Sequence, residues 1–237
     1  MKNIIVTGSS RGIGRAIVLH FANLGFGVAF CSRSDEKLQQ LAAEINETIP
    51  SAKIYFESCD MSQKDEIVRF AQNAIQKFKH FDIVVNNAGV FLPGEIFNAK
   101  DGELETMIDT NLYSAYYFTR ALLPTLTQQD RSHIFNMCSV ASLKAYPNGS
   151  LYTISKFALL GFSKSLREEL KDKNIRVTAI MPGATYTDSW QGIDLPETRF
   201  MKAEDIAVNI EDIYNLSDRT NVEEIILRPQ SVSYTHL

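Results

Sequence analysis

Cysteine is scarce in this 237-residue sequence, and so is any pattern that would bind a metal. The three cysteines, Cys31, Cys59 and Cys138, lie far apart, and their number is odd. They match neither a disulfide framework nor a zinc motif, so we expect reduced thiols buried near strand ends. The four histidines are isolated as well. We therefore expect no bound metal.

The sequence also lacks a long apolar run and an excess of positive charge. No apolar stretch is long enough to span a bilayer, and the apolar start of the chain is too short for a signal peptide. The net charge of −4 gives no electrostatic reason to expect nucleic acid or an anionic membrane as a partner. We therefore expect a cytoplasmic protein that binds a small molecule.

Short apolar strands alternate with amphipathic helices along the chain. We expect strands at residues 4–6, 27–31, 53–57, 81–85, 132–138, 174–180 and 223–228. This alternation predicts an α/β protein with a single-domain Rossmann fold: a doubly wound, seven-stranded parallel sheet with helices on both faces. The domain would cover residues 1–229, with a cofactor half up to about residue 90 and a catalytic half from 91 onward. An irregular tail would follow at 230–237.

A glycine-rich turn follows the first expected strand. Its spacing is Gly-x-x-x-Gly-x-Gly, which differs from the dinucleotide fingerprint Gly-x-Gly-x-x-Gly. Glycines let the backbone approach a pyrophosphate, and the following helix offers free N–H groups with a partial positive charge. A plain turn between a strand and a helix is the alternative. The residues expected to bind a dinucleotide here are Gly8, Ser10, Arg11, Gly12, Ile13 and Gly14.

The end of the second strand bears on the choice of dinucleotide. A carboxylate there would bind the ribose 2′-hydroxyl of NAD(H) and repel a 2′-phosphate. The sequence instead has Ser32 and Arg33, and Arg33 offers a planar fork for phosphate that Arg11 could supplement. These residues favour NADP(H). NAD(H) stays possible because Asp35 lies near the position expected for an acidic residue, and the arginines could simply be solvated.

Other strand ends supply further candidates. Asp60, beside Met61, could meet the adenine amino group or cap the helix that Ser62 begins, whose amphipathic pattern covers residues 64–78. The amide-rich turn after the fourth strand could form the floor of a crevice or an ordinary turn. The remaining expected cofactor contacts are Asn87, Ala88, Gly89, Pro182, Gly183, Thr185 and Thr187.

Tyr152 and Lys156 lie four residues apart near the start of a strong helical pattern, so they share one helix face. A free phenol has a pKa of about 10, too high for efficient proton transfer near pH 7. A positive charge about 4 Å away could lower that pKa by about three units. We expect Lys156 to make Tyr152 a proton-transfer group. Such pairs also occur by chance on helix surfaces.

Together these motifs resemble the short-chain dehydrogenase/reductase family, from residue 2 to about residue 229. The family implies that Tyr152 donates a proton to a substrate carbonyl and that Ser139 hydrogen-bonds the same oxygen. It implies that Lys156 holds the nicotinamide ribose and shifts the pKa of Tyr152. It also implies that Asn111 holds a water in the proton path and that Thr187 binds the carboxamide of the nicotinamide. The motifs that follow the family's order are Thr7-Gly8…Gly12…Gly14, Asn86-Asn87-Ala88-Gly89, Asn111, Ser139, Tyr152…Lys156 and Pro182-Gly183…Thr187.

Within the family, segments at 133–141, 182–190 and 222–229 look like the bacterial sepiapterin-reductase and carbonyl-reductase group. The resemblance implies an NADP(H)-dependent reductase that converts the ketone of a small molecule to an alcohol. A 3-oxoacyl-carrier-protein reductase, an NAD-dependent alcohol dehydrogenase and a catalytically silent NADP(H) sensor are the alternatives. The resemblance also implies a homodimer or homotetramer in which helices near 112–126 and 152–170 pair.

A substrate pocket is expected over the nicotinamide, beneath a loop at residues 185–199. Besides Ser139, its walls would include Tyr146, Tyr186 and the only tryptophan, Trp190. Core packing is the alternative role for the three aromatic residues.

Overall fold

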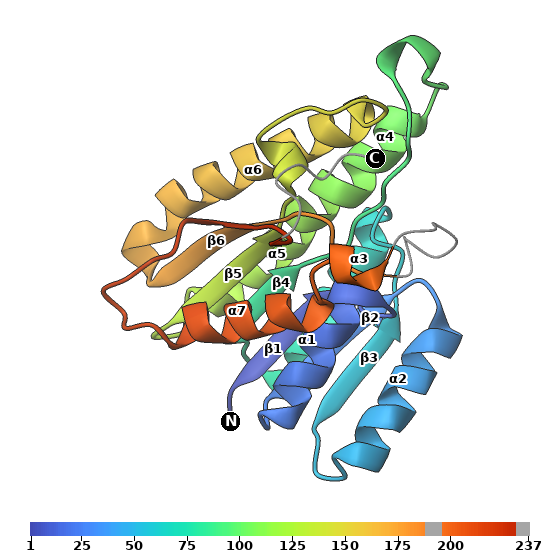
Figure 1. The fold of residues 1–237 in the computed structure, drawn as a ribbon. Coiled ribbons are helices and arrows are strands. Elements are labelled where there is room, and N and C mark those ends of the chain that lie inside the picture. The colour runs from blue at the N-terminus through green and yellow to red at the C-terminus, as the bar shows by residue number, and fades with distance from the viewer. Residues whose placement is uncertain (188–195, 231–237) are drawn as a thin grey trace.

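The computed structural model describes residues 1–187 and 196–230, which form one parallel sheet flanked by helices (Figure 1). The strand order is β3-β2-β1-β4-β5-β6-β7, so the predicted seven-stranded doubly wound fold is confirmed. The chain order reverses between β1 and β4, and ligands of such sheets bind beyond the carboxyl ends of the strands at that point. The strands are β1 Asn3–Thr7, β2 Gly27–Ser32, β3 Ile54–Ser58, β4 Ile83–Asn86, β5 Ser132–Met137, β6 Ile175–Pro182 and β7 Glu224–Leu227.

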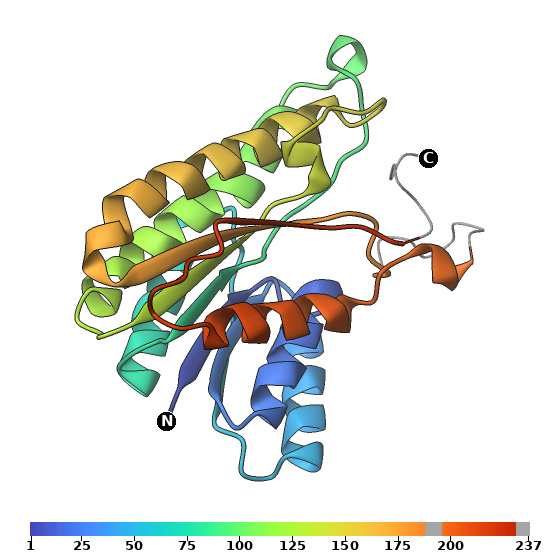
Figure 2. The same ribbon diagram turned by 60° about the vertical axis from the view of Figure 1, so that its left-hand side comes forward.

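Helices cover both faces of the sheet, as the turned view shows (Figure 2). One face packs against α1 (Gly12–Asn23), α2 (Asp35–Thr48) and α7 (Ala203–Asn215). The other face packs against α3 (Lys64–Phe78), α5 (Ser114–Leu126) and α6 (Ser150–Leu170). Among the described residues, no helix combines the length and the apolar character that crossing a bilayer requires.

The strand register places alternate residues in two separate cores. Ile4 pairs with Val28 and Ile83, and all three pack on the side of α1 and α7. Ile5, one residue further along, belongs to the core under α3 and α5. Because both faces are buried, the central strands read as uninterrupted apolar runs.

The helical stretch before β5 is broken close to the predicted position. Helix α4 (Glu103–Ile108) is followed by a π-helical segment, η2 (Asp109–Tyr113), and then by α5. Such π segments often occur at functional sites. The wider turn leaves Asn111 only 1% exposed, so its amide faces the interior.

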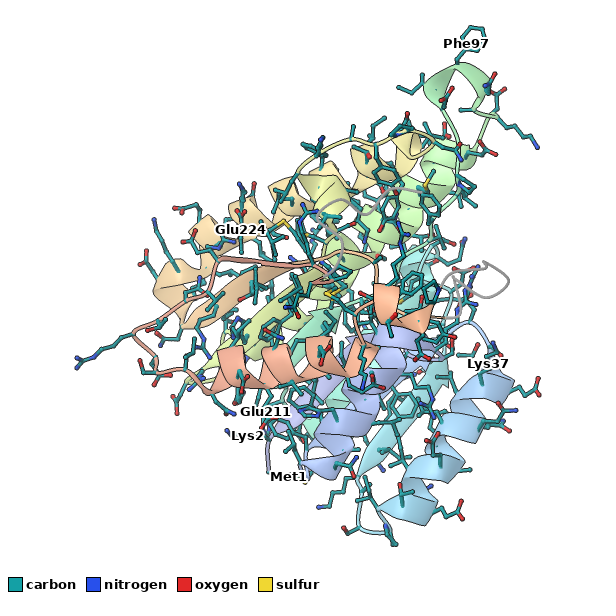
Figure 3. The ribbon with its side chains drawn as sticks, viewed as in Figure 1. Met1, Lys2, Lys37, Phe97, Glu211 and Glu224 are labelled. Carbon is teal, nitrogen blue, oxygen red and sulfur yellow. The ribbon has the colours of Figure 1, made fainter. Side chains whose placement is uncertain are left out.

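The three cysteines are free and buried, as predicted. Helix α3 runs from Lys64 to Phe78, as the amphipathic pattern predicted, and its N-cap is Gln63 rather than Asp60. The chain before α4 carries Phe97, which is 94% exposed and projects from the body of the molecule (Figure 3).

Candidate active site

The glycine loop packs tightly on the turn that follows β4. Gly8 has φ +70° and Gly12 has φ +55°, a left-handed region that side chains disfavour. A Cβ on Gly8 would lie 2.8 Å from the Ala88 Cα, and a Cβ on Gly14 would lie 2.3 Å from the Gly8 carbonyl oxygen. Glycine is therefore required by close backbone approach as well as by conformation.

Hydrogen bonds fasten the same two turns together. The Thr7 hydroxyl oxygen accepts bonds from the backbone N–H groups of Asn87, at 3.1 Å, and Ala88, at 3.0 Å. The Asn87 side-chain amide donates to the carbonyl oxygens of Thr7 and Gly8, both at 2.9 Å. Sequence analysis placed Asn87 near the cofactor and Thr7 in the glycine motif, but it did not predict the role of the Thr7 hydroxyl in joining the two turns.

The first turn of α1 has the groups that an anionic ligand needs. Arg11 occupies the N-cap position without a side-chain capping bond, and the turn holds no acidic residue. Uncapped N–H groups at a helix start attract phosphate. Thr187, beyond β6, lies against this loop, because a Cβ on Gly12 would come within 2.9 Å of its methyl carbon. These residues fit the pyrophosphate and nicotinamide parts of a dinucleotide.

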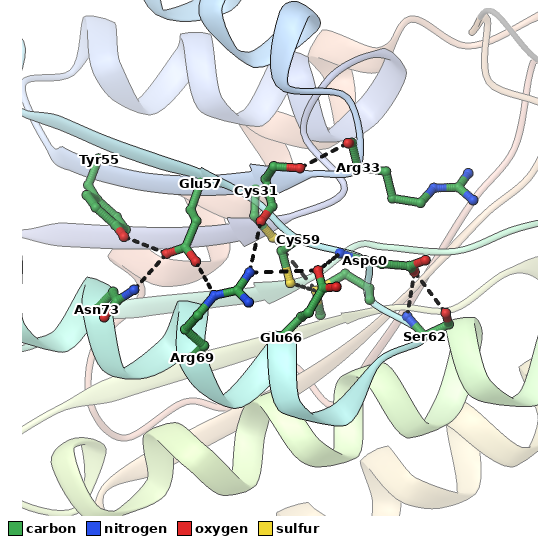
Figure 4. A network of polar contacts seen from close by, with 12 residues as sticks. Cys31, Arg33, Tyr55, Glu57, Cys59, Asp60, Ser62, Glu66, Arg69 and Asn73 are labelled. Carbon is green, nitrogen blue, oxygen red and sulfur yellow. Dashed lines mark hydrogen bonds and ion pairs between the residues drawn. The ribbon is translucent and has the colours of Figure 1, made fainter.

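The ends of β2 and β3 hold the residues expected near a 2′-phosphate and adenine. Ser32 is buried, whereas Arg33 is exposed and its guanidinium extends away from the neighbouring polar network (Figure 4). Asp60 Oδ1 accepts 2.9 Å bonds from both the backbone N–H and the hydroxyl of Ser62. Asp60 thus caps a turn ahead of α3. The arginine fork is available to a ligand.

The end of β6 is also held by hydrogen bonds. The Gly183 N–H donates to the Leu227 carbonyl oxygen at 2.7 Å, and the Thr185 hydroxyl donates to the Gly183 carbonyl oxygen at 3.1 Å. Pro182 is the last residue of β6. This turn leads directly to Thr187 and therefore sets its position beside the glycine loop.

Ser139, Tyr152 and Lys156 come together where β5 ends against α6. Ser139 caps a short turn, η3 (Val140–Ser142), with its Oγ accepting from the Ala141 N–H at 3.1 Å. Its side chain lies near enough to the Tyr152 phenol to act against the rise in the pKa of that group. The Lys156 ammonium nitrogen lies 5.6 Å from the centre of the Tyr152 ring and donates to the Met137 carbonyl oxygen at 2.8 Å.

Burial sets the protonation of this group. It raises the pKa of Tyr152 to about 12, although the nearby Ser139 side chain acts in the opposite direction. Burial also lowers the pKa of Lys156 to about 8, because the ammonium loses hydration. The predicted net lowering of the Tyr152 pKa is therefore wrong, because loss of hydration around the phenol outweighs any effect of the Lys156 charge. Tyr152 keeps its proton at pH 7.

Asn111 connects the turn after β4 to helix α6. Its side-chain amide donates to the Ser155 hydroxyl at 2.8 Å and to the Val90 carbonyl oxygen at 3.0 Å. Its Oδ1 accepts from the Val90 N–H at 2.7 Å. Ser155 in turn donates to the Tyr152 carbonyl oxygen at 2.8 Å. Asn111 thus positions the helix that carries Tyr152. Sequence analysis missed Ser155.

Phe91 contacts the Tyr152 ring, and Tyr146 lies nearby. Phe91 meets the Tyr152 ring edge to face with ring centres 5.1 Å apart, a contact that sequence analysis missed. Tyr146 is half-buried, and its pKa is raised by burial and by the nearby Tyr152. Tyr186 is exposed. Trp190 lies outside the described residues.

Residues 2–197 match the family model described as short chain dehydrogenase. The chain belongs to the short-chain dehydrogenase family. It is 33% identical over 246 residues to a sepiapterin reductase of Chlorobaculum tepidum, with 98% of each chain covered. This short-chain dehydrogenase is therefore an oxidoreductase by family.

Two solved structures of short-chain dehydrogenases resemble this one. A metagenomic short-chain oxidoreductase in complex with NADP shares 31% identity with a TM-score of 0.84, covering 97% of both chains. An alcohol dehydrogenase from the archaeon Thermococcus sibiricus, complexed with 5-hydroxy-NADP, shares 26% identity with a TM-score of 0.90, covering 100% of both chains. The similarity therefore extends over both halves of the sheet.

A second buried polar network in this short-chain dehydrogenase links strands β4 and β5 to helices α5 and α6. The Asn86 amide donates to Asn136 Oδ1 at 2.7 Å and to the Thr119 hydroxyl at 2.9 Å. The Asn136 amide continues the chain to the Ser163 hydroxyl on α6 at 2.8 Å. Sequence analysis did not identify this network, because isolated asparagines and serines inside strands and helices give no motif. These bonds tie β4 and β5 to α6, although the buried Asn86 Oδ1 has no hydrogen-bond partner among the described residues.

The pKa of Lys156 leads to a prediction about stability. Between about pH 8 and 10.5 the unfolded chain holds a proton on this lysine that the folded chain has lost, so stability rises with pH across that window. Lys156→Met removes this dependence. We expect the free energy of unfolding of the unmodified protein, relative to Lys156→Met, to increase by up to about 3 kcal/mol from pH 7 to pH 10. Urea unfolding of both proteins at the two pH values measures it.

Comparing the two proteins at each pH cancels the terms common to both, including the titration of Tyr152. The packing change at residue 156 does not depend on pH, so it cancels when the difference at pH 10 is compared with the difference at pH 7. A difference between them that does not vary with pH would contradict a buried lysine with a lowered pKa.

Proposed function

We propose that this protein is an NADP(H)-dependent reductase that converts the ketone of a small molecule to an alcohol, with Tyr152 as the proton donor. The observation that carries the proposal is the cluster of Ser139, Tyr152 and Lys156 at the carboxyl edge of the sheet. A phenol with a pKa of about 12 is protonated at pH 7, which is the form that reduction needs. The similarity to a sepiapterin reductase also supports reduction as the direction of the reaction.

The proposed mechanism assigns one task to each side chain. The chemistry that a reduced nicotinamide supplies when bound is hydride transfer. Ser139 donates a hydrogen bond to the carbonyl oxygen as negative charge develops on it. Tyr152 then gives its proton to that oxygen. The Ser139 side chain lies near the Tyr152 phenol, so one carbonyl oxygen could meet both donors.

Lys156 and Asn111 support the donor. With a pKa of about 8, Lys156 is mostly protonated at pH 7, and its charge stabilises the tyrosinate that remains after proton transfer. Asn111 would hold the water through which Tyr152 regains a proton. It also fixes α6 through Ser155. Lys156 would in addition hold the nicotinamide ribose.

We assign cofactor binding to the loops at the carboxyl ends of β1, β2, β3, β4 and β6. The 31% identical oxidoreductase was solved in complex with NADP, which supports the same cofactor here. The exposed guanidinium of Arg33, with that of Arg11, would pair with the 2′-phosphate. The proposed contacts are Gly8, Ser10, Arg11, Gly12, Ile13, Gly14, Ser32, Arg33, Asp60, Met61, Asn87, Ala88, Gly89, Tyr152, Lys156, Pro182, Gly183, Thr185 and Thr187.

Arg33→Asp should reverse the cofactor preference. A carboxylate at this position repels a 2′-phosphate and can bind a ribose 2′-hydroxyl. Loss of a charged hydrogen bond of about 1.5–3 kcal/mol weakens NADPH binding by about 10- to 100-fold. Fluorescence titration with NADPH and NADH measures both affinities. Arg219→Asp, the same change at an exposed arginine between α7 and β7, is the matched control. An unchanged preference in Arg33→Asp would mean that Arg33 does not contact the cofactor.

The substrate is tested by following nicotinamide absorbance with NADPH and a panel of ketones. The panel begins with pterin side-chain ketones, small diketones and 3-oxoacyl thioesters. Phe91 and Tyr146 supply aromatic surface beside Tyr152, which suits a planar or apolar ketone, and Tyr186 remains a proposed wall of the pocket. Turnover of any panel member supports the proposal. NADPH binding without turnover of any ketone would favour a silent nucleotide sensor.

We also propose a cytoplasmic homodimer or homotetramer. Exposed aromatic and aliphatic side chains lie on η2, α5 and α6, where two copies could pack: Tyr113, Tyr116, Ile154 and Phe157. Three free cysteines are consistent with a reducing compartment. Sedimentation equilibrium of the purified protein distinguishes the states, and a monomer at micromolar concentration would contradict the assembly.

A further inference from the structure

Three sulfur atoms meet beneath the ends of β2 and β3. The Sγ atoms of Cys31 and Cys59 lie 3.7 Å and 3.6 Å from the Met61 Sδ (Figure 4). Cys31 and Cys59 are 0% exposed and Met61 is 4% exposed. The cluster is therefore a compact, dry group of two thiols and one thioether.

Sulfur ligands at this spacing suit a single soft cation. With metal–sulfur bonds of about 2.3 Å, sulfurs in tetrahedral or trigonal arrangement lie about 3.8–4.0 Å apart. The two sulfur–sulfur separations are shorter than this by only a few tenths of an ångström. Thiolate and thioether donors together select Cu(I) over harder metals. We propose that Cys31, Cys59 and Met61 form a binding site for a soft monovalent cation of the Cu(I) type.

Charge balance fits a monovalent ion. One thiol releases its proton to solvent as its sulfur bonds to the cation, so the buried thiolate and cation are together neutral. The second cysteine sulfur and the thioether complete the coordination, and no electron is transferred. A neutral unit avoids the large penalty for burying a net charge. The spacing of these residues in the sequence matches no metal motif, so the site depends on the pairing of β2 with β3.

Cys138 provides an internal comparison. It is also buried, at 3% exposed, but the neighbouring group is the Ser163 hydroxyl at 4.0 Å. A lone thiol beside a hydroxyl lacks the soft donors that the other cluster has. Cys138 should therefore not retain Cu(I) against a competing ligand.

The position of the cluster connects it to the proposed cofactor site. Cys31 directly precedes Ser32, and Asp60 lies between Cys59 and Met61. The Cys59 N–H donates to the Ser32 carbonyl oxygen at 2.9 Å, so movement of the 59–61 turn is transmitted to the end of β2. We expect binding of Cu(I) to weaken the binding of NADPH, and this expectation rests on the proposed function.

The test is an anaerobic titration of the reduced full-length protein with Cu(I), in competition with bicinchoninate. We expect one tightly held Cu(I) per chain, and at least 10-fold weaker binding in Cys31→Ser and in Cys59→Ser. Met61→Leu, which conserves volume, should weaken binding less. Cys138→Ser should bind Cu(I) like the unmodified protein. These readouts need no enzyme activity, so failure of the proposed function would leave the site testable.

X-ray absorption of the loaded, unmodified protein removes the dependence on variants that could fail to fold. It should show sulfur alone around copper, with more than two sulfur neighbours. Failure of the protein to take Cu(I) from the competitor would overturn the site. Equal loss of binding in Cys138→Ser, or nitrogen and oxygen around copper, would overturn it as well.

Discussion

Replacing Tyr152 by phenylalanine is expected to lower kcat for ketone reduction by about 10²- to 10⁴-fold. The variant keeps the ring that packs against Phe91 but loses the hydroxyl that lies near Ser139. Binding of NADPH should change little, because the phenol is needed for proton transfer and the glycine loop is untouched. Steady-state kinetics and a fluorescence titration on the same preparation measure the two effects.

Tyr214→Phe is the matched control. Tyr214 is also buried, and burial raises its pKa to about 12, but it lies on α7 on the other face of the sheet. Loss of a buried phenol there should leave kcat near that of the unmodified protein. If Tyr152→Phe retained full turnover, Tyr152 would not be the proton donor.

Gly14→Ala should disrupt the close packing of the glycine loop and abolish tight binding of NADPH. The added methyl group would lie 2.3 Å from the Gly8 carbonyl oxygen and 2.5 Å from the Asn87 amide nitrogen, so backbone has to move. Overpacking of this kind costs about 3 kcal/mol of the free energy of unfolding. Denaturant unfolding without cofactor measures the loss of stability. Titration with NADPH measures the loss of cofactor binding.

Gly94→Ala is the control for the same chemical change. Gly94 lies in the chain between β4 and α4, its φ is outside the left-handed region, and a Cβ there would meet nothing within 4 Å. Replacing a glycine by alanine at a compatible position stabilises by about 0.4–1 kcal/mol. The two variants should therefore shift stability in opposite directions. A Gly14→Ala protein as stable as the unmodified one would show that the loop is not closely packed.

The sheet could be predicted because its physical causes are local. Strands buried on both faces are apolar throughout, and glycine or amide residues mark their carboxyl ends. Boundaries were less accurate, as for the fourth strand, which was predicted at 81–85 and is Ile83–Asn86. The break near Asn111 was also predicted, although the π-helical form that turns its amide inward was not.

The properties that depend on packing could not be predicted. The direction of the Tyr152 pKa depends on how far its phenol is buried, and no spacing rule contains that quantity. Ser155 and Thr7 act through hydrogen bonds to residues distant in the sequence or to backbone atoms. The sulfur cluster likewise exists only because Cys59 and Met61 follow the strand that pairs with β2.

The most direct test of the proposed function is a titration of the purified protein with NADPH and with NADH, following nicotinamide fluorescence. The arrangement of Arg11, Ser32 and Arg33 predicts tighter binding of NADPH. Tighter binding of NADH would contradict the 2′-phosphate site and favour an alcohol oxidant that uses Asp35. Binding of neither nucleotide would contradict the proposed enzyme while leaving the fold as described.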